Sequence, residues 1–225
     1  MKSKALELAD YQNMRSEVRS LMRTEAEFRG AGITFEVPHM NRYWEYGSVL
    51  AAMHEAGVKE RARVLDVGSG NGPLGPWLAR LGYRVDEIDP DSAVVGRTSL
   101  IPHLKDNDWA FASISLFEFK PGSSYDVVAS VSVMEHIPEE SQQDAWGRLV
   151  SLVKPGGLLV VTVDYGDEKA ANSHARAGIF TPETMPQIIS ALENLGIKFD
   201  EIDTEFKGEQ VYNYTFFRLV GRKVE

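Results

Sequence analysis

A glycine-rich loop directly after a short apolar segment constrains the fold of this chain most. Val64–Val67 is a run of strand-forming residues with one acid in it, and Gly68, Gly70 and Gly72 follow at alternate positions. Glycine tolerates positive φ and leaves no Cβ where a ligand must approach the backbone. In a doubly wound sheet, the turn after the first strand is where ligands bind. The sequence therefore predicts a strand, a ligand-binding turn and a helix in this order.

The segments after the loop alternate between strand and helix patterns. Strands are expected at residues 83–88, 109–114, 125–131 and 158–163. Helices are expected at about residues 73–81, 91–104, 139–152 and 182–195. This alternation is typical of parallel βαβ units. Residues 197–205 and 210–220 are expected to form a closing hairpin. The predicted fold class is therefore α/β, a doubly wound, mostly parallel seven-stranded sheet with an antiparallel last strand.

The N-terminal residues are expected to form a helical cap region. Residues 4–28 have a helical pattern that Gly30 and Gly32 end, and a second helix is expected from Arg42 to Ala56. We therefore divide the chain into a cap region, residues 1–60, and a core, residues 61–225.

Composition excludes several classes of function. The 225 residues include no cysteine, which excludes disulfides, Cys-ligated zinc and a thiol nucleophile. The net charge of −9 disfavours a nucleic-acid partner, since such a partner needs a basic face. No apolar stretch approaches the roughly 20 residues of a membrane helix, and the charged start does not resemble a signal peptide. We expect a cytoplasmic protein without a nucleic-acid or membrane partner, and its oligomeric state stays open.

An acid after the second predicted strand adds to the glycine loop. Asp89 follows that strand and precedes Pro90. A carboxylate at this position can accept charge-assisted hydrogen bonds from both hydroxyls of a ribose. The loop and Asp89 together therefore indicate an adenosine-containing cofactor, without saying which one.

A nicotinamide cofactor is one alternative. Gly70, Gly72 and Gly75 fit the spacing G-x-G-x-x-G, and Tyr165 and Lys169 form a Y-x-x-x-K pair as in short-chain dehydrogenases. Counted from the glycine at the strand end, however, a proline stands where the third glycine belongs, and the pair has no suitably placed serine. An NAD(P)-dependent oxidoreductase thus stays open as the second hypothesis.

Four segments in order resemble the class I S-adenosylmethionine-dependent methyltransferases. Val64–Gly72 looks like the first motif of that family, and Asp89 falls where its ribose-binding acid falls. Tyr125–Ile137 resembles the fourth strand and following loop of the small-molecule branch, and Leu152–Leu159 resembles the turn into the fifth strand. The resemblance implies S-adenosylmethionine as cofactor and in-line methyl transfer to an oxygen or nitrogen of a small molecule. A non-catalytic S-adenosylmethionine-binding protein stays open, because the cofactor motifs are clearer than any catalytic residue.

The same resemblance implies a set of cofactor-binding residues. An acid often follows the third strand in this family and holds the adenine amino group, but Ser113 or Ser115 stands there in this chain, and backbone groups near Ile114 are an alternative. Arg42–Tyr46 looks like a segment that lids the cofactor in some bacterial members. The expected cofactor-binding residues are Asp66, Gly68, Ser69, Gly70, Gly72, Asp89, Pro90, Ser113, Ile114, Ser130 and Val131.

The acceptor should lie above the carboxyl ends of the fourth and fifth strands. His136 could act there as a general base, or could only shape the cofactor pocket. Tyr165, His174 and Arg176 belong to a long segment after the fifth strand and are the expected substrate-binding residues. Some O-methyltransferases bind a metal through Glu-x-x-Glu-His, but the first position here is Ser132, so no metal is expected.

Overall fold

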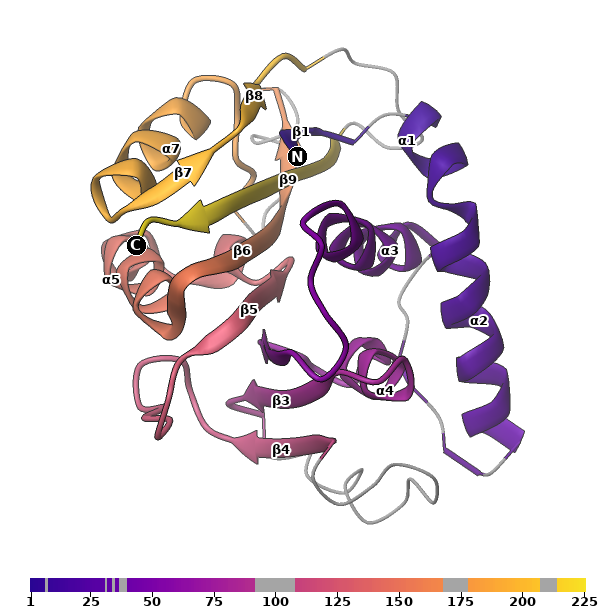
Figure 1. Cartoon of the computed structure of the whole chain (residues 1–225). Coiled ribbons are helices and arrows are strands. Elements are labelled where there is room, and N and C mark those ends of the chain that lie inside the picture. The colour runs from indigo at the N-terminus through magenta and orange to yellow at the C-terminus, as the bar shows by residue number, and fades with distance from the viewer. Residues whose placement is uncertain are drawn as a thin grey trace.

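One mixed sheet runs through the protein. The computed structural model describes residues 1–6, 8–30, 32–33, 35–36, 40–91, 108–167, 178–206 and 214–225. Its strands are β1 (Lys2–Ala5), β2 (Arg63–Val67), β3 (Arg84–Asp89), β4 (Trp109–Ser113), β5 (Tyr125–Val131), β6 (Val153–Gly166), β7 (Ile197–Phe199), β8 (Glu201–Asp203) and β9 (Tyr214–Lys223). Within the described residues, these strands form a nine-stranded sheet in the order β4-β3-β2-β5-β6-β9-β1-β8, with β7 paired to β9 (Figure 1). β2 to β6 are parallel to one another and β9 is antiparallel to β6, which confirms the predicted fold class.

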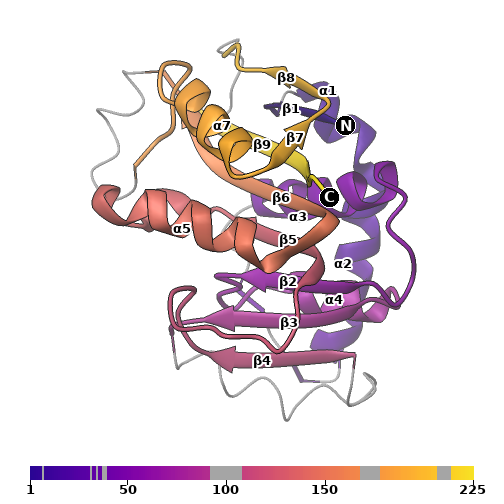
Figure 2. The same cartoon turned by 60° about the vertical axis from the view of Figure 1, so that its left-hand side comes forward.

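Helices cover both faces of this sheet. On one face lie α3 (Met40–Glu55) and α4 (Leu74–Arg80), with α2 (Arg15–Gly30) packed outside them and α1 (Leu8–Asn13) preceding it. On the other face lie α5 (Glu139–Leu152) and α7 (Met185–Asn194) (Figure 2). The helices predicted at about residues 73–81, 139–152 and 182–195, and the one from Arg42 to Ala56, are confirmed. The helix expected at residues 91–104 lies outside the described residues from residue 92 on.

The central strands are apolar on both sides, because both of their faces are buried. In β2, Leu65 packs in the core beneath α5 and α7, whereas its neighbour Val64 packs in the core beneath α3 and α4. Both side chains are fully buried. Successive side chains of a strand point to opposite faces, so this short segment holds both helical layers against the sheet.

The first residues of the chain differ from the helix predicted over residues 4–28. Lys2–Ala5 form β1, which pairs parallel with β8 and antiparallel with β9. The buried Ser3 hydroxyl donates to Val220 O (3.2 Å) and accepts the Val220 N–H (2.9 Å). Tertiary pairing with β9 therefore overrides the local helical pattern of this segment.

The insertion of β1 also divides the strand predicted at residues 197–205. β7 pairs with the end of β9, as the expected hairpin requires, but β8 pairs with β1 instead. The described residues therefore form two strands more than the seven predicted. One is β1, and the other arises because the strand predicted at 197–205 is divided into β7 and β8. The boundary proposed at residues 60/61 stays a prediction, although β1 joins the N-terminal region to the core sheet.

The carboxyl ends of β2, β5 and β6 lie side by side. Val67 is in register with Ser130, and Ser130 is in register with Val161. The residues just beyond these strands consequently meet at one edge of the sheet. Helix α3 packs on β5 and β6, which brings its first turns to the same edge.

Candidate active site

The glycine loop after β2 turns back onto the end of β3. The Gly68 N–H donates to Ile88 O (2.8 Å), and the Ser69 N–H reaches the same oxygen at 3.3 Å. Gly68 and Gly70 have φ values of +72° and +51°, in the left-handed region that glycine adopts without strain. These backbone hydrogen bonds and the left-handed conformation of two glycines therefore fix the path of the loop.

The three glycines of the loop serve different purposes. A Cβ at Gly68 would collide with Val133, and a Cβ at Gly72 would collide with the hydroxyl of Tyr46 in α3. A Cβ at Gly70 would meet no atom within 4 Å. Packing within the protein thus explains Gly68 and Gly72, whereas Gly70 borders open space beside Asp89.

Asp89 lies opposite this open space, at the end of β3. Its Oδ2 accepts the Gly70 N–H (2.8 Å) and its Oδ1 accepts the Asp91 N–H (2.8 Å). The side chain is half-buried, and Pro90 next to it is exposed. A carboxylate has about four acceptor positions, so Asp89 can still accept hydrogen bonds from a pair of neighbouring hydroxyls.

The other predicted residues of the cofactor site surround this position. Ser113 is in register with Asp89, and the Ile114 N–H donates to Asp89 O (3.0 Å). Asp66 is buried in β2, in register with Ala129 of β5. The structure therefore brings together the ends of β2, β3 and β4, as the sequence predicts.

Three buried polar atoms near the loop have no hydrogen-bond partner among the described residues. They are Ser69 Oγ, Asn71 Oδ1 and Ser130 Oγ. Val131, after Ser130, is buried too. Buried polar groups are normally hydrogen bonded, so unsatisfied ones in a native fold need an explanation. Together with the open space at Gly70, these atoms fit a bound ligand with several polar groups.

A buried carboxylate from α3 holds the ends of β5 and β6 together. Glu45 Oε1 accepts hydrogen bonds from the Ser132 hydroxyl (2.6 Å) and the Thr162 hydroxyl (2.7 Å). Its Oε2 forms an ion pair with Arg42 (3.0 Å), whose guanidinium also reaches Val131 O at 3.5 Å. Complete burial raises the pKa of the Glu45 carboxyl to about 7, although Arg42 and both hydroxyls counteract this.

Backbone conformation contributes to this arrangement. Ser132 has φ +49°, a left-handed conformation that is uncommon outside glycine. It directs the hydroxyl toward Glu45, while the Ser132 N–H donates to Thr162 O (3.0 Å). Non-glycine residues in this conformation are found more often at functional sites.

A second buried acid, Glu135, lies on the 3-10 helix Met134–His136 after β5. Its Oε1 accepts the Asp164 N–H (3.3 Å), while its Oε2 is buried without a hydrogen-bond partner in the described part of the chain. Burial, and then the negative charge of Asp164, raise the pKa of the Glu135 carboxyl to about 8. We refer to Arg42, Glu45, Ser132, Glu135 and Asp164 as the acidic edge.

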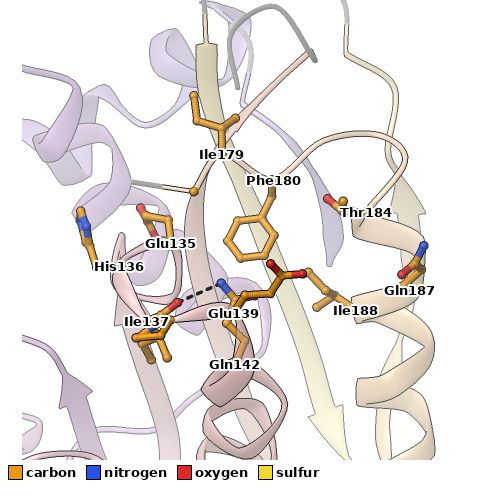
Figure 3. A pocket seen from close by; sticks show the side chains of 12 residues that line it. Glu135, His136, Ile137, Glu139, Gln142, Ile179, Phe180, Thr184, Gln187 and Ile188 are labelled. Atoms are coloured by element: carbon orange, nitrogen blue, oxygen red, sulfur yellow. Dashed lines mark hydrogen bonds between the residues drawn. The ribbon is translucent and has the colours of Figure 1, made fainter. Parts of the chain in front are cut away.

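A cavity of about 540 Å³ opens next to the acidic edge, between α5 and α7 (Figure 3). Figure 3 shows Glu135 and His136 on one side, Phe180 in the middle, and Thr184, Gln187 and Ile188 on the opposite side. The exposed His136 is one of the residues that line this space, which can hold a small molecule, and its role as a base stays a prediction.

Of the three predicted substrate-binding residues, the structure describes Tyr165. Tyr165 is fully buried, its hydroxyl donates to Thr204 O (2.5 Å), and its ring packs on Phe217. The prediction of a substrate contact there is corrected to a packing role, because β6 continues to Gly166 and its alternation turns Tyr165 into the core. His174 and Arg176 lie outside the described residues.

Sequence reasoning did not identify Glu45, Thr162 and Phe180 as site residues. A signal for Glu45 was present, because Arg42 and Glu45 are charges three residues apart in a helix that is otherwise mostly apolar. In the ranges that the structure describes, no group of three or more His, Cys, Asp and Glu side chains is placed to hold a metal ion. Over the same ranges, no helix has the length and apolar character needed to cross a membrane.

Comparison with known proteins links this geometry to one family. A family model for a methyltransferase domain matches residues 39–195, from the start of α3 to the end of α7. The ubiquinone biosynthesis O-methyltransferase of Xanthomonas axonopodis pv. citri (strain 306) is 34% identical over 116 residues, which are 51% of this chain and 46% of that protein. The chain thus spans about half the length of the curated relatives it matches.

Solved structures share the fold over a larger part of the chain. The 1,6-didemethyltoxoflavin-N1-methyltransferase of Burkholderia thailandensis, with bound 1,6-didemethyltoxoflavin and S-adenosylhomocysteine, has a TM-score of 0.62 at 15% identity and covers 98% of this chain and 92% of its own. The [4+2]-cyclase SpnF has a TM-score of 0.62 at 16% identity and covers 84% and 85%. At these identities the likeness establishes the fold alone.

Proposed function

This chain belongs to the class I S-adenosylmethionine-dependent methyltransferases, and we propose that it transfers the methyl group of S-adenosylmethionine to an oxygen or nitrogen of a small-molecule acceptor. One observation carries the proposal. Asp89, held by the Gly70 N–H, and the cavity lined by Glu135 and His136 lie beyond the carboxyl ends of strands of the same parallel sheet. A cofactor and an acceptor can therefore meet above β5.

Asp89 and the glycine loop are the proposed cofactor site. When bound, S-adenosylmethionine supplies an electrophilic methyl group on its sulfonium. Asp89 would accept hydrogen bonds from the ribose hydroxyls, and Gly70 leaves the space that the nucleoside needs. The Ser69 and Ser130 hydroxyls, which lack partners in the described residues, would gain them from the ligand.

His136 is the proposed proton acceptor. It lies at the cavity beside Glu135, and the turn that carries both is held by Gln142, whose amide donates to Met134 O (3.3 Å) and Ile137 O (3.2 Å). For the proposed in-line displacement, the His136 imidazole would take up the proton that the acceptor oxygen or nitrogen loses on methylation. The names of the relatives support both kinds of acceptor, since they include O- and N-methyltransferases.

The test begins with the cofactor. Calorimetry should show binding of S-adenosylmethionine and S-adenosylhomocysteine, with NAD much weaker or undetected, and tighter binding of NAD would favour the oxidoreductase. Incubation with a metabolite extract and isotopically labelled S-adenosylmethionine should then yield a labelled product in mass spectrometry. Cofactor binding without transfer to any compound would favour a non-methylating role, which the fold also allows, since a [4+2]-cyclase shares it.

A further inference from the structure

The outer face of α2 carries three arginines that have no partner in the described part of the chain. Arg15, Arg19 and Arg23 are exposed, and none of them forms an ion pair or a hydrogen bond there. They follow one another at four-residue intervals, so they lie on one side of the helix. α2 packs on α3 and α4 from the outside of the molecule (Figure 1). A chain of net charge −9 therefore presents a row of cations on one outer helix.

The acids of the same helix are engaged with other groups. Glu25 is buried and forms an ion pair with Arg29 (2.7 Å). Glu27 forms an ion pair with Arg80 of α4 (3.2 Å), and Glu17 accepts a hydrogen bond from the hydroxyl of the serine before it (2.6 Å). The charges of the arginine row are therefore left for a partner outside the described residues.

The arginine row borders a groove on the same face. The described residues that line this groove of about 620 Å³ are Ser16, Arg19, Met22, Arg23 and Ala26. Met22 is apolar and yet 38% exposed. The groove consequently offers an apolar contact directly beside two cations.

The type of cation indicates the type of partner. α2 contains arginines and no lysine, and the planar guanidinium of arginine binds a carboxylate through two parallel hydrogen bonds. Helices that bind a membrane surface expose several large apolar side chains that enter the lipid, whereas Met22 is the single large hydrophobic residue exposed on α2. A protein segment that carries carboxylates therefore fits this face better than a bilayer does.

The spacing of the arginines matches that of a second helix. Arginines four residues apart are separated by about 6 Å along the axis, and glutamates four residues apart on a helix lying alongside have the same separation. We propose that this face of α2 is a docking surface for an acidic helix of a partner protein. Its glutamates, at every fourth position, pair with Arg15, Arg19 and Arg23, and an apolar side chain packs on Met22. No residue of the proposed methyl-transfer site lies on α2, so this docking is independent of that reaction.

Two synthetic helices test the proposal. One is an alanine-rich peptide with three glutamates four residues apart and a leucine beside the middle one, and in the other peptide glutamine replaces each glutamate. Fluorescence anisotropy measures the binding of each labelled peptide to the full chain at low and at physiological salt. An exposed ion pair strengthens binding about two- to fivefold, so the glutamate peptide should bind at least about tenfold more tightly, and less so as salt rises. Equal binding of the two peptides, or no binding of either, would overturn the proposal.

Substitutions on α2 assign the effect to its residues. Arg15→Gln, Arg19→Gln and Arg23→Gln together should abolish the preference for the glutamate peptide, and glutamine is itself a good helix former. Arg19→Glu with Arg23→Glu should instead prefer a peptide with lysine in place of glutamate. That gain of binding cannot come from an unfolded variant.

A control variant removes the same charge elsewhere. Arg84→Gln, Lys120→Gln and Lys198→Gln change exposed side chains outside α2 and should leave the preference for the glutamate peptide intact. An equal loss in this control would mean that only net charge matters, which would overturn the proposal. Vesicles that contain phosphatidylglycerol are the last comparison. If they bind through the same arginines more tightly than the glutamate peptide does, the partner is a lipid surface and the proposed helix is wrong.

Discussion

The glycine loop with Asp89 and the acidic edge are neighbours, but they are built by different means. Around the loop, backbone N–H groups donate to Ile88 O and to the Asp89 carboxylate, and the segments concerned are about 20 residues apart in the chain. At the acidic edge, buried side chains of α3, of Ser132 just after β5 and of β6 bind one another across 87 and 117 residues. The first region depends on the shape of the backbone, whereas the second depends on the charge of a few side chains. Substitutions should therefore affect binding in the first region and stability in the second.

The largest expected effect is on stability, at the centre of the acidic edge. Glu45→Ala would leave Arg42 without its ion-pair partner and the Ser132 and Thr162 hydroxyls without their acceptor. Removal of one partner from a buried ion pair costs about 3–5 kcal/mol, so we expect a loss of that size in the free energy of unfolding, measured by urea denaturation. Glu45→Gln keeps an acceptor for both hydroxyls and should lose less. Wild-type stability of the alanine variant would show that the edge does not depend on this charge.

The next effect concerns binding, at the glycine loop. Asp89→Ala removes the proposed acceptor of two ribose hydroxyls and should weaken S-adenosylhomocysteine binding about 10²–10³-fold in calorimetry, or roughly 3–4 kcal/mol. Asp89→Asn should cost less, because its amide oxygen still accepts one bond. Asp91→Ala is the control, since the Asp91 backbone N–H, and not its side chain, binds Asp89. If both alanine variants bind like the parent, the ribose site lies elsewhere.

A third effect is the pH dependence of the free energy of unfolding, which arises at the acidic edge. The folded state holds the Glu135 proton up to a pKa of about 8, and the Glu45 proton up to about 7, whereas an unfolded Glu releases its proton near pH 4.3. Both groups therefore favour the folded state fully below that lower value, and this stabilisation is lost as the pH rises toward 8. We expect the free energy of unfolding to fall by up to about 1.4 kcal/mol per pH unit for each group, between about pH 5 and pH 7 for Glu45 and between about pH 5 and pH 8 for Glu135.

Glu135→Gln should make this decline shallower, whereas the exposed Glu139→Gln should leave it unchanged. Urea denaturation at several pH values measures both slopes. A slope in Glu135→Gln as steep as that of the parent would mean that Glu135 titrates normally in the folded protein.

The smallest effect compares two substitutions at one position. Ser132→Ala and Ser132→Gly both remove the hydroxyl that binds Glu45, but only glycine relieves the left-handed backbone. We expect the glycine variant to be about 1 kcal/mol more stable than the alanine variant in urea denaturation. Equal stabilities would show that the conformation at Ser132 costs little.

The difference between the two regions also explains what the sequence could predict. The loop, Asp89 and their meeting at one sheet edge follow from adjacent strand and turn patterns, because parallel strands place their carboxyl ends together. The bond between Glu45 and Thr162 joins residues 117 positions apart, and no local pattern encodes such a contact. The apolar pattern predicts a strand end at residue 163 and so places Tyr165 in the cleft, but the longer β6 buries its side chain. No local pattern predicts the N-terminal strand, because it is a strand through its pairing with β9.

That pairing has a consequence for the order in which the protein is made. Lys4 is in register with Arg218, so β1 cannot form this pair until β9 has been synthesised. Domains generally begin to fold from the N-terminus during synthesis, and contacts between distant residues form slowly. Residues 2–5 must therefore remain unpaired while the parallel strands assemble behind them. The nascent chain therefore cannot complete the sheet before translation reaches β9.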